Sequence, residues 1–159
     1  MTRGVRMYTE CGLYEFILRA KNNTYAGDGE RCISTRKSSV DMEYIEGNLC
    51  YHDTYFANVD FSGQEAVYYK DRPVWTMVYY GKVTRPDMVS ASEIGAMIKE
   101  SLSMMYIEGR FLGGFSYQKD NFCYIDRNEG EFSYFHGTEV IFKDGIPVYE
   151  LKYTGGTLD

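Results

Sequence analysis

The spacing of apolar residues divides the chain into helix-like and strand-like stretches. From Thr9 to about Lys21, apolar residues recur at i, i+3, i+4 and i+7, which predicts a helix with Thr9 as its N-cap. A second helix is predicted after Ser90, because Ser90 and Glu93 have the spacing of a capping box. The remaining apolar residues alternate with polar ones in short stretches, which is typical of strands.

The strand-like stretches form two groups, and each group follows one helix. The first group is predicted at 40–45, 49–56, 64–69 and 74–80. The second group is predicted at 115–117, 121–126, 130–135, 138–142 and 148–153. The stretch at 130–135 has no counterpart in the first group. Each half of the chain therefore has a helix followed by four matching strands.

The same two halves are related by sequence repetition. FSGQEAVYYKDRPVWTMVYYG (61–81) returns 74 residues later as FHGTEVIFKDGIPVYELKYTG (135–155), and YIEGNLCYHD (44–53) matches YQKDNFCYID (117–126) at an offset of 73. The helices match at an offset of 81, which pairs Leu13 with Ile94 and Phe16 with Met97. We therefore predict a single domain over 1–159 made of two pseudo-symmetric α-ββββ repeats, at about 8–83 and 89–156.

The predicted fold class is α+β, with one twisted antiparallel sheet or half-barrel and both helices packed on one face. Neither repeat can bury its helix and its sheet face alone, so the two must share one core. Whether the sheet is open or closed is left undecided by the pattern. In the strand at 74–80, the outward-facing residues Val74, Val78 and Tyr80 are apolar. This predicts additional coverage, either by the 22–39 loop or by another subunit.

Composition narrows the class of protein. The chain has 159 residues, of which 44% are hydrophobic and 25% charged, as in a globular domain. Its net charge of −6 argues against direct binding of nucleic acid. No apolar run could span a membrane, and the loose lead-in at 1–7 carries no signal sequence, so we expect a cytoplasmic protein without membrane contact. No motif indicates a metal or other cofactor, and Cys50 and Cys123 are interpreted as buried, reduced thiols.

Several separated stretches match a known family in order: AKNNTYAGDGE (20–30), YHDTYF (51–56), the 61–81 segment and EGEFSYFHGTEVIFKDGIPVYELKYTGG (129–156). On these the chain resembles the uncharacterised bacterial DUF5680 domain family, whose members occur alone or after an XRE-type helix-turn-helix. The resemblance implies no activity, but the position behind a DNA-binding domain implies a sensing or interaction role. The seven or eight residues before the first helix leave no room for such a domain here. A regulatory role would therefore need a separate regulatory protein.

Two pairs of acidic residues occupy equivalent repeat positions: Asp53 with Asp126, and Glu65 with Glu139. If a pseudo-twofold axis brings them together, their pKa values would be pushed apart, which suits general acid–base catalysis. We favour the alternative, that they satisfy backbone amides at strand ends and turns. Repeat copies share structure more readily than function.

Aromatic residues are the second set of candidates. Sixteen Tyr, nine Phe and one Trp are more than one core needs, so some could line an amphipathic pocket between sheet and helices. We predict Trp75, Tyr79, Tyr149 and Tyr153 as ligand-binding residues, with Tyr25 closing over the pocket from a loop. His52 and His136 have no Ser or Cys nucleophile at a recognisable spacing, so we interpret both as hydrogen-bonded structural residues.

Three functional hypotheses follow from these residues. The first is a non-enzymatic binding or sensory domain that takes a small apolar or aromatic ligand. The second is a small hydrolase or isomerase that uses the paired carboxylates. The third is a protein-interaction module, with a homodimer as one version, that uses the outer face near Val74, Val78 and Tyr80.

Overall fold

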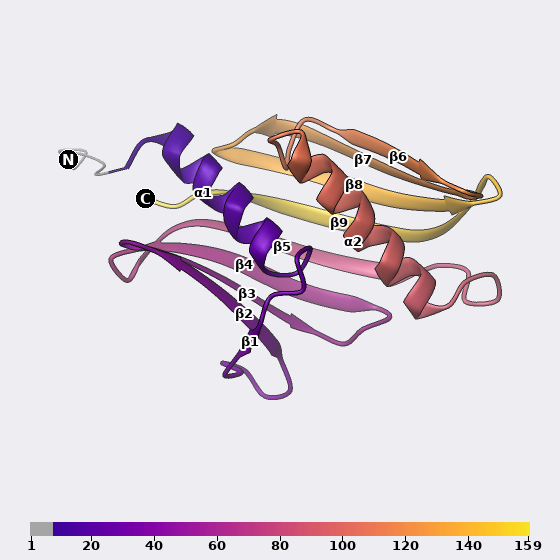
Figure 1. Ribbon diagram of the computed structural model, residues 1–159, viewed down its shortest axis with the longest axis horizontal. Coiled ribbons are helices and arrows are strands. Elements are labelled where there is room, and N and C mark those ends of the chain that lie inside the picture. Colours follow the sequence, from indigo (N-terminus) through magenta and orange to yellow (C-terminus); the bar gives the residue numbers. More distant parts are fainter. Residues whose placement is uncertain (1–7) are drawn as a thin grey trace.

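The computed structural model describes residues 8–159, so the predicted lead-in lies outside the described residues. These residues form two helices and nine strands (Figure 1). In chain order they are α1 Glu10–Asn23, β1 Arg31–Cys32, β2 Val40–Glu46, β3 Leu49–Phe56, β4 Phe61–Tyr69, β5 Arg72–Val83, α2 Ala91–Ile107, β6 Phe115–Lys119, β7 Phe122–Glu131, β8 Tyr134–Lys143 and β9 Ile146–Thr157.

The strands form one antiparallel sheet in the order β1-β2-β3-β4-β5-β9-β8-β7-β6. The two halves of the chain meet at its centre, where β5 pairs with β9 along nearly the whole of both strands. Strands β1 and β6 are the two edges, so the described sheet is open and not a closed barrel. It is strongly twisted, as Figure 1 shows, and the fold is α+β as predicted.

Both helices lie on the same face of the sheet (Figure 1). Helix α1 packs on β2 and β3, and α2 packs on β6 and β7. Both predicted N-caps are present: Thr9 Oγ1 accepts from the Gly12 amide, and Ser90 and Glu93 form the reciprocal capping box. The two halves thus share one arrangement of a helix followed by four consecutive strands, β2–β5 and β6–β9. The first half has the short strand β1 in addition, within the stretch that was predicted as the 22–39 loop. Their origin by duplication stays a prediction from the sequence.

The predicted separate strand at 130–135 is wrong. Residues up to Glu131 continue β7, Phe132 and Ser133 form a turn, and β8 begins at Tyr134. Gly130 lets the hairpin close tightly, because its φ is +93° and a Cβ there would lie 2.2 Å from the carbonyl oxygen of Tyr134. The turn itself contains no Gly, Pro, Asn or Asp, so the sequence carried no signal for it.

The sheet face under the helices carries the hydrophobic core. Tyr51 and Tyr124 point towards the helices from β3 and β7 and are buried. Their neighbours Cys50 and Cys123 point to the opposite face and are half-buried, not buried as expected. The alternation of side chains along a strand explains the difference.

The opposite face of the sheet is covered only in part. The 33–39 loop folds over β2 and β3, where Arg36 lies 5.2 Å from the Phe56 ring, and it does not cover the outer residues of β5 as predicted. Val78 and Tyr80 remain 42% and 52% exposed. Val74, expected beside them, is instead buried, because a register shift opposite Val67 and Tyr68 makes it the extra residue of a β-bulge.

Candidate functional site

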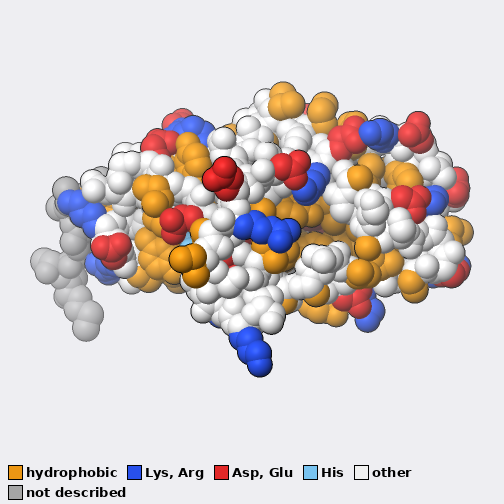
Figure 2. Space-filling model, turned by 60° about the horizontal axis from the view of Figure 1, so that its bottom comes forward, with side chains coloured by type: hydrophobic (Ala, Val, Ile, Leu, Met, Phe, Trp, Pro, Cys, Tyr) orange, Lys and Arg blue, Asp and Glu red, His pale blue; other side chains and the backbone are white. Residues whose placement is uncertain are grey.

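A cavity of about 140 Å³ lies between the two helices and the sheet. Its walls are both apolar and polar. The apolar part is formed mainly by Phe61, Met77, Ile94, Ile98, Leu102, Met105, Phe111 and Leu151. The polar part is formed mainly by Lys21, Asp53, Glu65, Asp126 and Glu139 and by Tyr25, Tyr51, Tyr55, Tyr79, Tyr106 and Tyr153. In the space-filling view of Figure 2, a hollow bordered by hydrophobic and basic side chains lies near the centre of the face shown.

All four predicted carboxyls line this cavity. Asp53 on β3 lies opposite Glu65 on β4, and Asp126 on β7 lies opposite Glu139 on β8. Directly opposed residues share one face of a sheet, so both pairs project under the helices. The hydrogen bonds of these carboxyls go to side chains, so the interpretation as acids that cap backbone amides is wrong.

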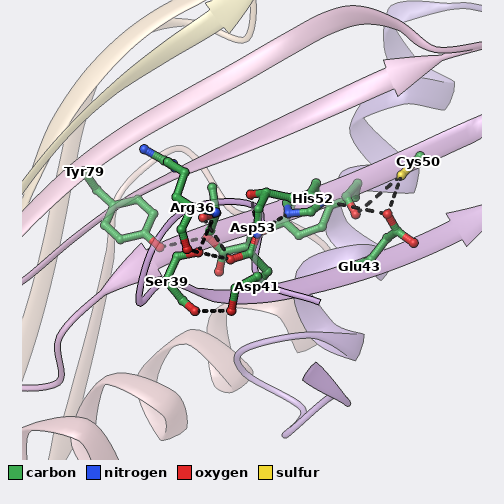
Figure 3. Close-up of polar contacts among 12 residues, drawn as sticks. Arg36, Ser39, Asp41, Glu43, Cys50, His52, Asp53 and Tyr79 are labelled. Atoms are coloured by element: carbon green, nitrogen blue, oxygen red, sulfur yellow. Dashed lines mark hydrogen bonds and ion pairs between the residues drawn. The ribbon is translucent and has the colours of Figure 1, made fainter. Parts of the chain in front are cut away.

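Each of the two aspartates accepts a hydrogen bond from a tyrosine two strands away. Tyr79 on β5 donates its hydroxyl to Asp53 Oδ1 on β3, at 2.8 Å (Figure 3). Its ring crosses the intervening strand at Gly63, where a Cβ would lie 2.4 Å from the tyrosine hydroxyl oxygen. Only glycine leaves enough room for this crossing.

The second half contains the same crossing. Tyr153 on β9 donates to Asp126 Oδ1 on β7, at 2.7 Å, and passes over Gly137 on β8. A Cβ at Gly137 would again lie 2.4 Å from the hydroxyl oxygen. The repeated Asp, Gly and Tyr positions of the sequence are therefore parts of one hydrogen-bonded unit that positions the aspartates.

The two glutamates differ in their partners. Lys21 Nζ donates to Glu65 Oε2 at 2.5 Å, and both side chains are buried. The Lys21 ammonium also lies 5.2 Å from the centre of the Phe111 ring. In the other half, Asp126 Oδ2 and Glu139 Oε2 are buried acceptors that receive no hydrogen bond from the residues the structure describes. Such atoms are rare in native interiors and call for an explanation.

Burial raises the pKa of three of these carboxyls, because a buried carboxylate loses its hydration. The pKa of Asp53 rises to about 7, with a further contribution from the neighbouring Glu65 carboxylate. Burial raises the pKa of Asp126 to about 6, against the hydrogen bond from Tyr153. For Glu139, burial and then the Asp126 charge raise the pKa to about 8. At pH 7, Glu139 is therefore mainly protonated and Asp126 mainly ionised.

A family model described as a domain of unknown function (DUF5680) matches residues 53–158. The chain belongs to this family. The matched segment contains all four carboxyls of the cavity, whereas Lys21 and Tyr25 precede it. No curated protein and no solved structure matches the chain. The DUF5680 assignment thus supports the resemblance seen in the sequence without naming an activity.

Three of the five predicted ligand-binding aromatics of this DUF5680 domain line the cavity, namely Tyr25, Tyr79 and Tyr153. Trp75 and Tyr149 do not reach it. Both are fully buried, and each stacks on phenylalanine rings in the core. Each ring follows the extra residue of a β-bulge, Val74 on β5 or Val148 on β9, and packs in the core beside the cavity.

The sequence analysis missed several residues that line the cavity, among them Lys21, Tyr51 and Tyr106. The Tyr106 hydroxyl faces all four carboxyls, each of which adds to the effect of burial in raising its pKa. A signal for it existed, because the helix offset of 81 pairs Tyr106 with Tyr25. Lys21 carried no such signal, since a lysine in the last turn of a helix is normally exposed.

A separate polar cluster lies on the other face of the sheet (Figure 3). Asp41 accepts hydrogen bonds from Ser39, Thr35 and His52, and these hold its pKa well below the usual range even though burial acts in the opposite direction. Ser39 and His52 both bond to the aspartate, so the described geometry lacks the serine–histidine contact of a hydrolase. The cluster fastens the 33–39 loop to the sheet, and His52 is hydrogen-bonded within it, as predicted.

Two further findings describe residues 8–159 as a whole. Within this range, there is no group of three or more His, Cys, Asp or Glu side chains that could hold a metal ion. No helix in the same range has the length and the apolar character needed to cross a membrane.

Proposed function

We propose that this protein is a non-enzymatic binding domain that takes a small amphipathic molecule into the cavity between the helices and the sheet. One observation carries the proposal: the cavity combines an apolar wall with buried carboxyl oxygens that accept no hydrogen bond from the described residues. A ligand that contacts both parts of the wall would fill the empty space and would give the buried carboxyl oxygens a hydrogen-bond partner.

The size of the cavity limits the ligand. An engineered apolar cavity of about 150 Å³ in another protein binds benzene, so a cavity of about 140 Å³ fits a compact molecule with roughly six to ten non-hydrogen atoms. Ile98, Leu102 and Met105 offer such a molecule an apolar surface on α2. A longer chain or a fused ring system would need the helices to move.

The electrostatics support the same proposal. Keeping carboxyls buried with raised pKa values costs stability at neutral pH, and a core of apolar residues would avoid that cost. Groups that destabilise a fold and face a cavity are typical of functional sites. We therefore assign these carboxyls to ligand recognition.

The proposal can be tested by a fragment screen with ligand-observed NMR on the whole chain. Gly95 lines the cavity and a Cβ there would meet no atom within 4 Å, so Gly95→Leu should fill the cavity without disturbing α2. Ala96→Leu adds the same bulk to the exposed side of the same helix and serves as the control. Fragments should bind the wild type and Ala96→Leu at least about tenfold more tightly than Gly95→Leu. Equal binding to all three proteins, or no binding at all, would overturn the proposal.

A second candidate function is a small hydrolase or isomerase. It is favoured by the different pKa values of two neighbouring carboxyls, about 6 for Asp126 and about 8 for Glu139. In such a pair, Asp126 can act as the base and Glu139 as the acid. The fragments that bind should be incubated with the protein and followed by NMR for conversion. Conversion that Glu139→Gln abolishes would establish the enzyme, whereas bound fragments that stay intact for days would favour the binding domain.

A further inference from the structure

The two halves of the protein place different side chains at one equivalent position. Leu13 and Ile17 of α1 are buried, as are Ile94 and Ile98 at an offset of 81 in α2. Each helix also packs on the corresponding strands of its own half. The same offset pairs Lys21 with Leu102, and both of these side chains line the cavity.

In the first half, this position supplies a cation to the glutamate. The Lys21 ammonium donates to Glu65 Oε2 at 2.5 Å, within a buried ion pair. A buried carboxylate is stable only when such a partner compensates its charge. The first half therefore shows which group this carboxyl environment accepts: a primary ammonium that enters from the helix side.

In the second half, Leu102 provides no cation. The Arg110 guanidinium lowers the pKa of Asp126, but its hydrogen bonds go to Glu108 and to the Gly114 carbonyl. Asp126 is only 3% exposed, and its Oδ2 atom is a buried acceptor without a hydrogen bond from the described residues, as is Glu139 Oε2. The Tyr124 hydroxyl lies near Glu139 and lowers its pKa, but no hydrogen bond of good geometry joins the two. Lys21 faces Glu139 from α1 as well, yet its hydrogen bond goes to Glu65.

We propose that the ligand carries a primary ammonium group that binds between Asp126 and Glu139, in the place that a lysine at position 102 would occupy. The inference rests on the proposed function and names the class of ligand for that cavity. The apolar remainder of the ligand packs on Leu102, Ile98 and Met105. Anionic ligands are excluded, because the cavity already contains four carboxyls and its lysine is paired.

Binding should be coupled to proton release. Glu139 faces Asp126 on β7, Glu65 on β4 and Lys21 on α1, and Tyr106 on α2 faces all of these acids. When an ammonium enters, Glu139 loses its proton to the solvent and the new ion pair forms. The affinity for an amine should therefore rise with pH, by up to about tenfold per unit between pH 6 and pH 8.

Benzylamine and benzyl alcohol are suitable probes, since they have equal numbers of non-hydrogen atoms and only the amine is charged at neutral pH. Isothermal titration calorimetry with the whole chain should show benzylamine binding at least about tenfold more tightly than the alcohol. Repeating the titration in buffers with different ionisation enthalpies should reveal the released proton. Glu139→Gln should lower the amine affinity at least about tenfold and leave that for benzyl alcohol unchanged.

A built-in cation gives the most specific test. Leu102→Lys should supply the missing ammonium and abolish benzylamine binding, as Lys21 already does for Glu65. Met104→Lys adds the same charge to the exposed side of α2 and should bind benzylamine like the wild type. Each variant should first be shown to unfold cooperatively, so that loss of binding is not loss of the fold.

The outcomes separate the two proposals. If benzyl alcohol or other neutral fragments bind as tightly as benzylamine, or if Glu139→Gln keeps the amine affinity, the ammonium inference is overturned and the binding cavity stands. If neither amines nor neutral fragments bind, both proposals fail. If benzylamine binds and Leu102→Lys does not prevent it, the ammonium lies elsewhere and the inference fails.

Discussion

Replacing Glu139 by glutamine should make the protein more stable at neutral pH. The Glu139 pKa is raised from 4.5 to about 8, chiefly by burial and then by the Asp126 charge. In the unfolded chain the same carboxyl is ionised at pH 7, so folding requires it to take up a proton. Glutamine has nearly the shape of the protonated acid and needs no proton.

The size of the effect follows from the two pKa values. Because the folded pKa is raised, the contribution of Glu139 to stability is fully present below pH 4.5 and is lost as the pH rises towards 8. Each pH unit in that window costs about 1.4 kcal/mol. At pH 7, about 2.5 units above 4.5, Glu139→Gln should therefore increase the free energy of unfolding by about 3 kcal/mol. At pH 5 the gain should fall below about 1 kcal/mol.

Chemical denaturation with urea at pH 5, 6, 7 and 8 measures these differences directly. Glu131→Gln is the control, because Glu131 is exposed at the end of β7 and its replacement should change the free energy of unfolding by less than about 0.5 kcal/mol. A Glu139→Gln protein that is no more stable than the wild type at pH 7 would refute this reasoning. So would a gain that does not shrink between pH 7 and pH 5.

Four further substitutions test the stability of the fold. Lys21→Met should lower the free energy of unfolding by about 3–5 kcal/mol, since it leaves the buried Glu65 carboxylate unpaired. Adding Glu65→Gln should recover most of this loss. A loss below about 1 kcal/mol for Lys21→Met alone, measured by urea denaturation, would contradict the prediction. Gly63→Ala should cost about 2–5 kcal/mol because its Cβ meets the Tyr79 hydroxyl. Tyr79→Phe should cost about 1–3 kcal/mol, because it removes the hydrogen bond to Asp53. In a double-mutant cycle, the losses from Gly63→Ala and Tyr79→Phe should be less than additive. Strict additivity would mean that the Tyr79 ring does not cross β4 at Gly63. Ser90→Ala should cost about 1 kcal/mol by removing the capping box, and an unchanged melting temperature would show that the cap does not stabilise α2.

Local patterns in the sequence were sufficient for the elements of the fold. The N-caps at Thr9 and Ser90 and the apolar stripes of both helices depend only on residues within a few turns. The alternation in the strands depends on nearest neighbours in the same way. The repeat then indicated one sheet with both helices on the same face. The turn at Phe132 and Ser133 was not predicted, because its geometry comes from the pairing of β8 with β7 and β9, and Gly130 is the one glycine beside it.

The site could be predicted only in part. The equivalence of the paired acids was visible in the sequence, and three of the five chosen aromatics do line the cavity. Trp75 and Tyr149 do not line the cavity, because residue type does not show whether an aromatic ring packs in the core or faces a cavity. Lys21 was missed because its exposure depends on the position of α1 over β2 and β3.

By itself, the sequence determined the helices, most strands and the α+β class, since these follow from periodicity along the chain. The equivalence of the two halves stays a prediction from the repetition. The tertiary structure decided that the sheet is open, that the carboxyls of both halves meet in one cavity, and that only one glutamate has a lysine partner. The physical reason is distance along the chain. Asp53 and Asp126 come to share a cavity only after β5 pairs with β9 and both helices cover the same face. Their charges and pKa values depend on that burial, which no local pattern records.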